Sequence, residues 1–307
     1  MTKPALTTPA AGSGRTGDLA LLLVLAVLWG GSYTFIKVGV GTIPPVSLIA
    51  ARTLIAGALL LVVLRLRGLR LPTDPAIWRR FMTQAYLNSV VPFTLIAWAE
   101  RSVDAGLATI LSSTSPIFVV LLSSVLVTSE RVGRVRLLGV LAGLAGTVLI
   151  VGTQALSGFG EQLASQIALV AASLCYAGAA LFGRNFKGLD PIMPAAGSLV
   201  CGAAVLIPIS LVLDRPWTLA PSIESIQALI ALSVVSTALA FVIYFRLIAR
   251  LGAAGATSVA YLRVPAGVAI GMVFLGETLA PSAWAGLVLV VGGVVAMTAP
   301  ERRRSRD

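Results

Sequence analysis

Arg263 is the residue of this chain whose type and position point most directly to chemistry. It lies within the apolar segment 253–275, about ten residues from each end, so a bilayer-spanning helix would hold it near mid-membrane. A cation there costs a few kcal/mol or more, so it should face a wet cavity or a partner. A guanidinium that faces a cavity can bind an anionic group such as an amino-acid carboxylate. The alternative is a structural arginine, satisfied by carbonyls freed at Pro265 or by a neighbouring helix.

Aromatic and hydroxyl side chains in other apolar segments are candidates to line the same cavity. Trp29 and Tyr33 are four residues apart, which places them on one face of a helix. The run 112–115 carries hydroxyls directly before Pro116. The expected substrate-binding residues are Trp29, Tyr33, Tyr86, Asn88, Ser112, Ser115, Tyr176, Tyr244, Tyr261 and Arg263.

Prolines interrupt several apolar segments, at Pro92, Pro116, Pro208 and Pro265. Proline frees a carbonyl and bends a helix, which a membrane tolerates where a cavity or a neighbour satisfies the backbone. We expect Pro116 and Pro265 to form a central hinge or a cavity wall. Ordinary helix curvature is the alternative.

Groups that bind metals are scarce in this chain. Histidine is absent, which removes the commonest metal ligand and proton shuttle. Cys175 and Cys201 both lie in apolar runs, as small packing residues do. We therefore expect no metal and no cofactor.

Acidic residues avoid the middle of every apolar segment. Lys37, Glu100, Glu130 and Glu277 lie at predicted helix ends, where we expect boundary residues or helix caps. Carriers coupled to protons or sodium usually place a carboxylate within a span. Its absence favours a process that follows the gradient of the transported solute.

Composition places these residues in a membrane. Hydrophobic residues make up 57% and charged residues 11% of the chain, whereas soluble domains carry about 25% charge. The mean hydropathy is +0.96, and a chain of 31.7 kDa leaves no room beside its spans for a soluble enzymatic domain. We predict an all-α integral membrane protein. Its ten transmembrane helices lie near 18–37, 45–65, 79–99, 104–127, 134–152, 162–184, 191–213, 225–247, 253–275 and 281–299. The third and eighth are interrupted at Asn88, Pro92, Ser236 and Thr237.

The distribution of Lys and Arg predicts the orientation. With the amino terminus in the cytoplasm, the outside segments hold only Lys37, Arg101 and Arg215, and two arginines lie inside spans. The other eighteen of the 23 basic residues fall in inside segments. The positive-inside rule then places both termini in the cytoplasm. The net charge of +11 follows this alternation and does not gather on one domain, which argues against a nucleic-acid partner.

A short pattern occurs twice, about 147 residues apart. Trp29, Gly31, Lys37 and Pro44 recur as Tyr176, Gly178, Arg184 and Pro191; Ala105, Gly106 and Pro116 recur as Ala254, Gly255 and Pro265; Glu130, Gly139 and Gly146 recur as Glu277, Gly286 and Gly293. Each half holds five spans, an odd number, so the second half enters the membrane from the opposite side and the repeats are inverted. The predicted organisation is a flexible cytoplasmic tail (1–17), a first repeat (18–152), a second repeat (153–299) and a basic cytoplasmic tail (300–307).

Glycines spaced four apart allow close contact between helices, as in Gly139 with Gly143 and Gly267 with Gly271. We expect these glycines to pack inside the bundle of a monomer. The same Gly-x-x-x-Gly pairs leave a dimer open.

Several segments together carry a resemblance to a known family. They are Trp29-Gly30-Gly31-Ser32 with Lys37, Ala105-Gly106-Leu107-Ala108 through Pro116 and Glu130, and Ala254-Gly255 through Pro265 with Leu275-Gly276-Glu277. In them the chain resembles the drug/metabolite transporter superfamily, in its ten-helix EamA-type branch, over roughly residues 18–299. The resemblance implies a basket-like bundle of two inverted five-helix repeats, with a central cavity lined by the first, third, fourth, sixth, eighth and ninth helices. It also implies a place in the bacterial inner (plasma) membrane and similarity to exporters of aromatic amino acids.

We therefore expect an exporter of small metabolites, above all of amino acids with aromatic or large apolar side chains. Its partners would be this small-molecule substrate and the lipid bilayer, and it would work by alternating access. The alternatives are export of a nucleoside, a sugar derivative or a cationic drug, or an integral membrane enzyme. An enzyme would need a cluster of acids, histidines or a nucleophile with its base, and the sequence offers none.

Overall fold

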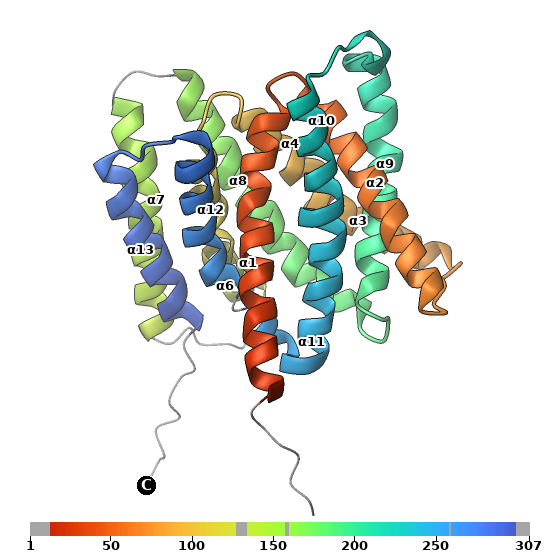
Figure 1. Cartoon of the computed structure of the whole chain (residues 1–307). Helices are drawn as coiled ribbons and strands as arrows, with labels where there is room; N and C mark the ends of the chain where they lie inside the picture. Colours follow the sequence, from red (N-terminus) through yellow and green to blue (C-terminus); the bar gives the residue numbers. More distant parts are fainter. Residues whose placement is uncertain (1–12, 127–133, 157–159, 258, 299–307) are drawn as a thin grey trace, which may run out of the picture.

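The computed structural model describes residues 13–126, 134–156, 160–257 and 259–298, and over these ranges the chain is all-helical (Figure 1). The first half holds α1 (Ser13–Gly39), α2 (Pro45–Leu66), α3 (Pro75–Ala85), η1 (Tyr86–Val90), α4 (Val91–Ala99), α5 (Ala105–Ser112), α6 (Ser115–Leu126) and α7 (Arg134–Leu156). The second half holds α8 (Gly160–Phe182), η2 (Gly183–Phe186), α9 (Ile192–Leu213), η3 (Pro216–Thr218), α10 (Ile223–Ile230), η4 (Ala231–Leu239), α11 (Ala240–Thr257), α12 (Val259–Leu275) and α13 (Pro281–Thr298).

These elements form the ten predicted spans in their predicted order. Three spans are interrupted: α3–η1–α4, α5–α6 and α10–η4–α11. Among the described residues, six helical stretches are long and apolar enough to cross a membrane, and shorter apolar stretches lie in α7, α12 and α13. The all-α integral membrane fold is confirmed.

The two halves run in opposite directions. We call the end of the bundle where α1 begins and α13 ends the near end, and the opposite one the far end. In Figure 1, α1 runs from the near end to the far end, whereas α8, the first helix of the second half, runs back from the far end. Corresponding helices pair, α2 with α9 and α7 with α13, and the first helix of each half packs on the fourth of the other, α1 on α12 and α8 on α5 and α6. Two inverted repeats produce this reciprocal pairing.

Glycines bring α7 and α13 into direct backbone contact. A Cβ added at Gly146 would lie 2.8 Å from the carbonyl oxygen of Gly286, and one at Gly293 would lie 2.5 Å from that of Gly139. No side chain larger than hydrogen fits without a shift of the backbone. These glycines therefore serve packing inside the bundle, as predicted.

The third helix of each half contains a π-helical segment, η1 in the first and η4 in the second. Ser89 of η1 and Ser236 of η4 correspond at the spacing of the repeat. Both serines are fully buried, and neither hydroxyl has a hydrogen-bond partner among the described residues. A π segment widens one helical turn and is frequent at functional sites. The polar interruptions noted in these two spans are thus local changes of helix type.

The prolines differ in their effect on the helices. The fourth span breaks between Ser112 and Ser115, directly before Pro116. Pro208 and Pro265 instead lie inside the unbroken α9 and α12, so the interruption expected there does not occur. A proline removes one backbone hydrogen bond, and the turns on either side retain theirs.

Five helix ends lie four or more residues from their predicted positions: α1 begins at Ser13 and not at 18, α7 ends at Leu156 and not at 152, α12 begins at Val259 and not at 253, and the other two are those of α3 and α11. α3 begins at Pro75 and not at 79, because Asp74 caps it by accepting a hydrogen bond of 2.8 Å from the Ala76 amide and proline suits the first helical position. α11 continues to Thr257, beyond the predicted end at 247.

Candidate functional site

Arg263 lies half-buried in α12 beside the break between α5 and α6. Its Nη2 donates to Ser113 Oγ at 3.3 Å, and that hydroxyl in turn donates to the Thr109 carbonyl at 2.7 Å. The Nε of Arg263 is buried and has no hydrogen-bond partner among the described residues. A guanidinium presents five N–H donors, and within the described residues one long hydrogen bond engages only one of its nitrogens.

Close contacts between helices fix the backbone that carries Arg263. A Cβ at Gly30 of α1 would lie 2.8 Å from the Arg263 carbonyl oxygen and 2.7 Å from the Gly267 amide nitrogen. On the other side of α12, a Cβ at Gly267 would lie 2.7 Å from the methyl carbon of Thr109 in α5. α12 is held between α1 and α5, so the guanidinium has little freedom beyond its own rotamers.

A second cation, Arg52 of α2, is buried in the same part of the bundle. Its Nε donates to Thr237 Oγ1 of η4 at 3.0 Å, and its guanidinium carbon lies 3.8 Å from the centre of the Phe93 ring. Thr237 itself donates to the Leu232 carbonyl at 2.7 Å, five residues back along the π segment. Arg52 is therefore held by a hydroxyl and an aromatic face, which supports the structural role of a buried arginine.

Tyr176 of α8 lies near both arginines. Its ring meets Phe93 edge to face with centroids 6.4 Å apart, and Tyr33, Arg52 and Arg263 lie near enough to its phenol to influence its charge. Tyr33 is itself only 4% exposed. Three of the predicted residues, Tyr33, Tyr176 and Arg263, thus come together from α1, α8 and α12.

Trp29 and Tyr244 form a separate aromatic cluster. Their ring centroids lie 5.1 Å apart, and Phe241 and Phe245 of α11 extend the group through contacts of 6.2 Å to Trp29 and 5.5 Å to Tyr244. The two predicted residues are neighbours, as expected, but within an apolar group built by α1 and α11.

The other predicted residues are less clearly placed. Tyr86 in η1 is 44% exposed and makes no ring contact that the structure describes. Asn88 is half-buried in η1, Ser112 is fully buried with an unpartnered hydroxyl, and Ser115 is half-buried at the start of α6 beside the equally half-buried Pro116. The side chain of Tyr261 lies outside the described residues, and Pro265 is exposed on α12. Their part in binding stays a prediction.

Four residues of this site were not among the predicted ones: Arg52, Phe93, Ser113 and Thr237. Arg52 carried a usable signal, because a cation within an apolar span needs a partner wherever it lies. Ser113 belongs to the hydroxyl run before Pro116, but its neighbours in that run looked equally suitable. Phe93 and Thr237 gave no signal beyond the interruptions nearby.

Charged residues at the far end join the two halves. Glu277 accepts hydrogen bonds from the Ala105 and Gly106 amides at 2.7 and 2.8 Å, so it caps α5 of the opposite half. Lys37 donates to the Val103 carbonyl at 2.8 Å. Glu100 directly follows α4, as expected of a boundary residue, but it is 0% exposed and its carboxyl oxygens have no hydrogen-bond partner among the described residues. Glu130 lies outside the described residues.

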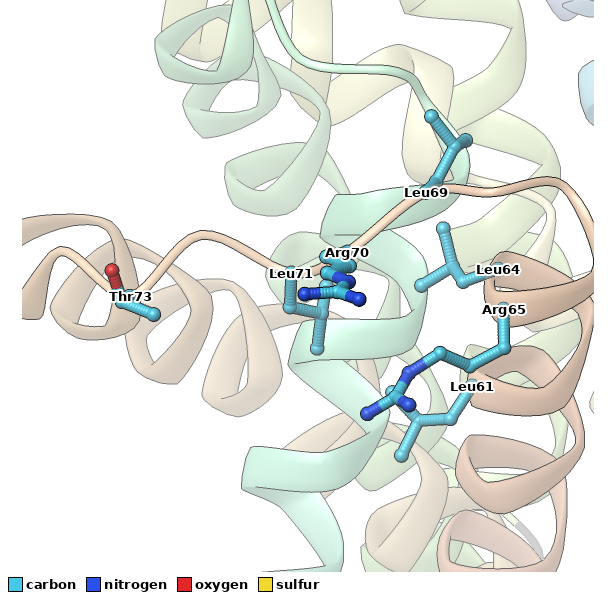
Figure 2. Close-up of a pocket in the computed structure, with 7 residues that line it drawn as sticks. All are labelled: Leu61, Leu64, Arg65, Leu69, Arg70, Leu71 and Thr73. Carbon is cyan, nitrogen blue, oxygen red and sulfur yellow. The ribbon is translucent and has the colours of Figure 1, made fainter.

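A pocket of about 270 Å³ lies apart from these residues, where α2 ends (Figure 2). Its lining consists of Leu61, Leu64, Arg65, Leu69, Arg70, Leu71 and Thr73. The side chains of Arg65 and Arg70 reach into the same space in Figure 2. None of the predicted substrate residues lines this pocket.

Among the described residues, no three His, Cys, Asp or Glu side chains are grouped as a metal would need. The two cysteines are free thiols, Cys201 buried and Cys175 half-buried. What the arrangement around Arg263 can do is bind an anion through charge-assisted hydrogen bonds, beside aromatic rings that suit an apolar group.

Known proteins of similar sequence are membrane transporters. A probable amino-acid metabolite efflux pump of Salmonella typhimurium (strain LT2) is 30% identical over 92% of this chain and 94% of its own length. An uncharacterized inner membrane transporter of Escherichia coli (strain K12), YedA, is 28% identical over 90% of this chain and 89% of its own. A probable terminal-alkyne amino-acid exporter of Streptantibioticus cattleyicolor is 25% identical over 93% of this chain and 95% of its own.

A chain of known crystal structure has the same fold, with a TM-score of 0.64, 21% identity, and coverage of 94% of this chain and 99% of that one. The sequence signature of the EamA-like transporter family matches residues 16–152 and, a second time, residues 163–299. Each match falls on one five-helix half. With both halves matched and the helices paired as inverted repeats, this chain belongs to the EamA-like transporter family.

Proposed function

We propose that this protein exports amino acids with aromatic or large apolar side chains across the inner membrane. It works by alternating access and follows the gradient of the substrate. Two relatives of this chain are named as a probable amino-acid metabolite efflux pump and a probable amino-acid exporter, which supports this class of substrate.

The observation that carries the proposal is the incompletely bonded guanidinium of Arg263. It is half-buried within the bundle, its Nε is unpartnered, and its described hydrogen bond to Ser113 is 3.3 Å long. A substrate carboxylate would supply the paired, charge-assisted hydrogen bonds that Ser113 cannot. The Nε of Arg52, by contrast, is bonded to Thr237, and the plane of its guanidinium lies against the ring of Phe93.

The rings near the two buried arginines support the preference for an apolar side chain. Tyr176, Phe93 and Tyr33 offer faces and edges, and each ring pair contributes about 0.5–1.5 kcal/mol beyond the burial of its area. The unpartnered hydroxyls of Ser112 and Ser89 are candidates to hold polar atoms of the substrate.

Hydrogen bonds between the halves support a far end that is closed. Ser47 of α2 donates to Asp214 at the end of α9 at 2.8 Å, Ser225 of α10 donates to the Val38 carbonyl at 2.9 Å, and the Ser102 and Ser165 hydroxyls are 2.7 Å apart. Glu277 adds its two hydrogen bonds to α5. Substrate would then enter from the near end, and export would require these bonds to open.

The orientation follows from the basic residues, with both chain ends and the near end in the cytoplasm. A cysteine placed at Ser222, at the start of α10, should react with a membrane-impermeant maleimide from outside intact cells. One placed at Arg70, beyond the near end of α2, should react only after the cells are opened. The reverse pattern would overturn both the orientation and the direction of export.

Counterflow in proteoliposomes that contain only this protein tests the function. Liposomes loaded with an unlabelled amino acid should accumulate the labelled one without any imposed ion gradient, with large apolar side chains fastest. A preference for sugars or nucleotides would reject the substrate class. Loss of counterflow when only a proton gradient is collapsed would reject the energetics.

A further inference from the structure

Glu100 is a buried carboxyl group that the transport site does not use. It directly follows α4 at the far end, where it is 0% exposed. Neither of its carboxyl oxygens has a hydrogen-bond partner among the described residues. Buried polar groups are almost always hydrogen-bonded, so an acid with two unsatisfied oxygens requires an explanation.

The charged groups that act on Glu100 are already bound to other atoms. They are Lys37 of α1, Arg52 of α2 and Glu277, between α12 and α13. Lys37 donates to the Val103 carbonyl and Arg52 to the Thr237 hydroxyl, and Glu277 accepts from the α5 amides. From α8, the hydroxyl of Ser165 is paired with that of Ser102. None of these groups supplies a hydrogen bond to Glu100.

Burial in such surroundings favours the neutral acid over the carboxylate. Burial raises the pKa of the Glu100 carboxyl well above its usual range; Lys37 opposes this shift and Glu277 adds to it. Separation of the far end would admit water to Glu100 and return its pKa toward the ordinary value. The closed far end therefore binds a proton more tightly than the open one.

We propose that Glu100 is a proton-binding site that keeps the far end closed, taking up one proton as that end closes and releasing it to the water there as it opens. Because the proton enters and leaves at the same end, it sets how readily the far end opens and is not carried across the membrane. The inference goes beyond the proposed function and does not depend on which substrate is exported.

The sign of the pH effect follows from proton linkage. Glu100 binds its proton more tightly when the far end is closed. Its stabilisation of the closed end is therefore complete at pH values below the pKa that Glu100 has when the end is open. It is lost as the pH rises through the closed-state pKa. Opening of the far end should increase with pH, by at most about tenfold per pH unit for one proton.

Accessibility of a buried cysteine at the far end measures this opening without any substrate. Both native cysteines are first replaced, by Cys175→Ser and Cys201→Ser. In this background Val103→Cys provides a buried thiol, and a second protein with Thr218→Cys provides an exposed reference thiol. The ratio of their labelling rates removes the pH dependence of thiol chemistry itself. In proteoliposomes, this ratio should rise at least threefold between pH 6 and pH 9.

Glu100→Gln keeps the size of the side chain and removes its titration, so the ratio should stay low and flat. Asp104→Asn is the matched control, because Asp104 is an exposed acid four residues away whose side chain caps nothing; it should keep the native response. Lys37→Gln removes the cation that opposes the neutral form of Glu100, so the midpoint of the rise in the labelling ratio should move to higher pH. This variant tests the inference independently if Glu100→Gln does not fold.

A native protein with a flat ratio, or a Glu100→Gln protein with the native rise, would overturn the inference. So would an Asp104→Asn protein that loses the response. Failure of amino-acid counterflow would reject the proposed function alone, since the labelling ratio contains no substrate.

Discussion

The fourth helix is built differently in the two halves of this protein. In the first half it breaks into α5 and α6 before Pro116, whereas in the second half α12 continues through Pro265. The repeat aligns Thr114, which lies in the break, with Arg263. Thr114 is fully buried and its hydroxyl donates to the Leu111 carbonyl at 2.8 Å, while Arg263 extends across to Ser113 beside the break.

This difference shows what the inverted repeat provides and what it leaves to individual residues. Paired helices, π segments and glycine contacts recur in both halves and build a symmetric frame. Arg263 has no arginine at the corresponding position of the first half, where Thr114 lies, and the break between α5 and α6 faces it from that half. A symmetric frame suits two alternating states, and under the proposed function Arg263 would be the binding group in both of them.

Replacement of Arg263 should have the largest effect on transport. Arg263→Ala should reduce counterflow per folded molecule by about 10–100-fold, since hydrogen bonds to charged groups contribute about 1.5–3 kcal/mol. Arg263→Lys, which keeps the charge without the fork, should fall between alanine and the native protein. Thr114→Ala, the change at the corresponding position, should stay within a few-fold of native.

Thermal melting of the same proteins separates binding from packing. If Arg263 served only structure, the alanine variant would melt early and transport normally per folded molecule. The proposed role requires the opposite, near-native melting with lost transport, because the change removes a cation that was costly to bury.

A side chain added where α1 contacts α12 should lower the stability of the protein. Gly30→Ala puts a Cβ within 2.8 Å of the Arg263 carbonyl and should lower the free energy of unfolding by about 1–3 kcal/mol. Gly31→Ala is the matched control, because its Cβ meets only Ile270 Cδ1, at 3.4 Å. Equal melting temperatures for the two variants would contradict the clamped position of α12.

The two prolines should give the smallest effects. If the break before Pro116 flexes during transport, Pro116→Ala should slow counterflow about two- to fivefold by allowing α5 and α6 to join. Pro265→Ala should change it less, because α12 is already continuous. A larger effect at Pro265 would place the hinge in the second half.

The frame could be predicted from the sequence because it depends on patterns that repeat. Span lengths, the alternation of basic loops and the doubled motif gave ten helices in two inverted halves, as the structure has them. The π-helical segments η1 and η4 could be located from the sequence only as polar interruptions. Asn88, Ser236 and Thr237 indicate polarity within a span but not a change from α to π geometry.

The site was harder to predict, because it depends on which residues meet across the halves. Arg263 was identifiable as a cation within a span, but its contact with Ser113 and not Ser112 depends on the local unwinding. Trp29 and Tyr244 belong to one apolar cluster and Tyr33 and Tyr176 to another, a division that spacing along the chain cannot give. Glu100 was identified as a residue at a helix end, but its complete burial there could not be read from its own segment, because burial depends on which other elements pack around it.

The central claim is that Arg263 binds the carboxylate of the substrate, and inhibition of counterflow by an amino acid and by its carboxamide tests it most directly. Phenylalanine and phenylalaninamide share the ring and the ammonium group, so their ratio of inhibition constants isolates the carboxylate. The native protein should prefer the acid by about 10–100-fold, and Arg263→Ala should bind both about equally. An undiminished preference for the acid in Arg263→Ala would contradict the account.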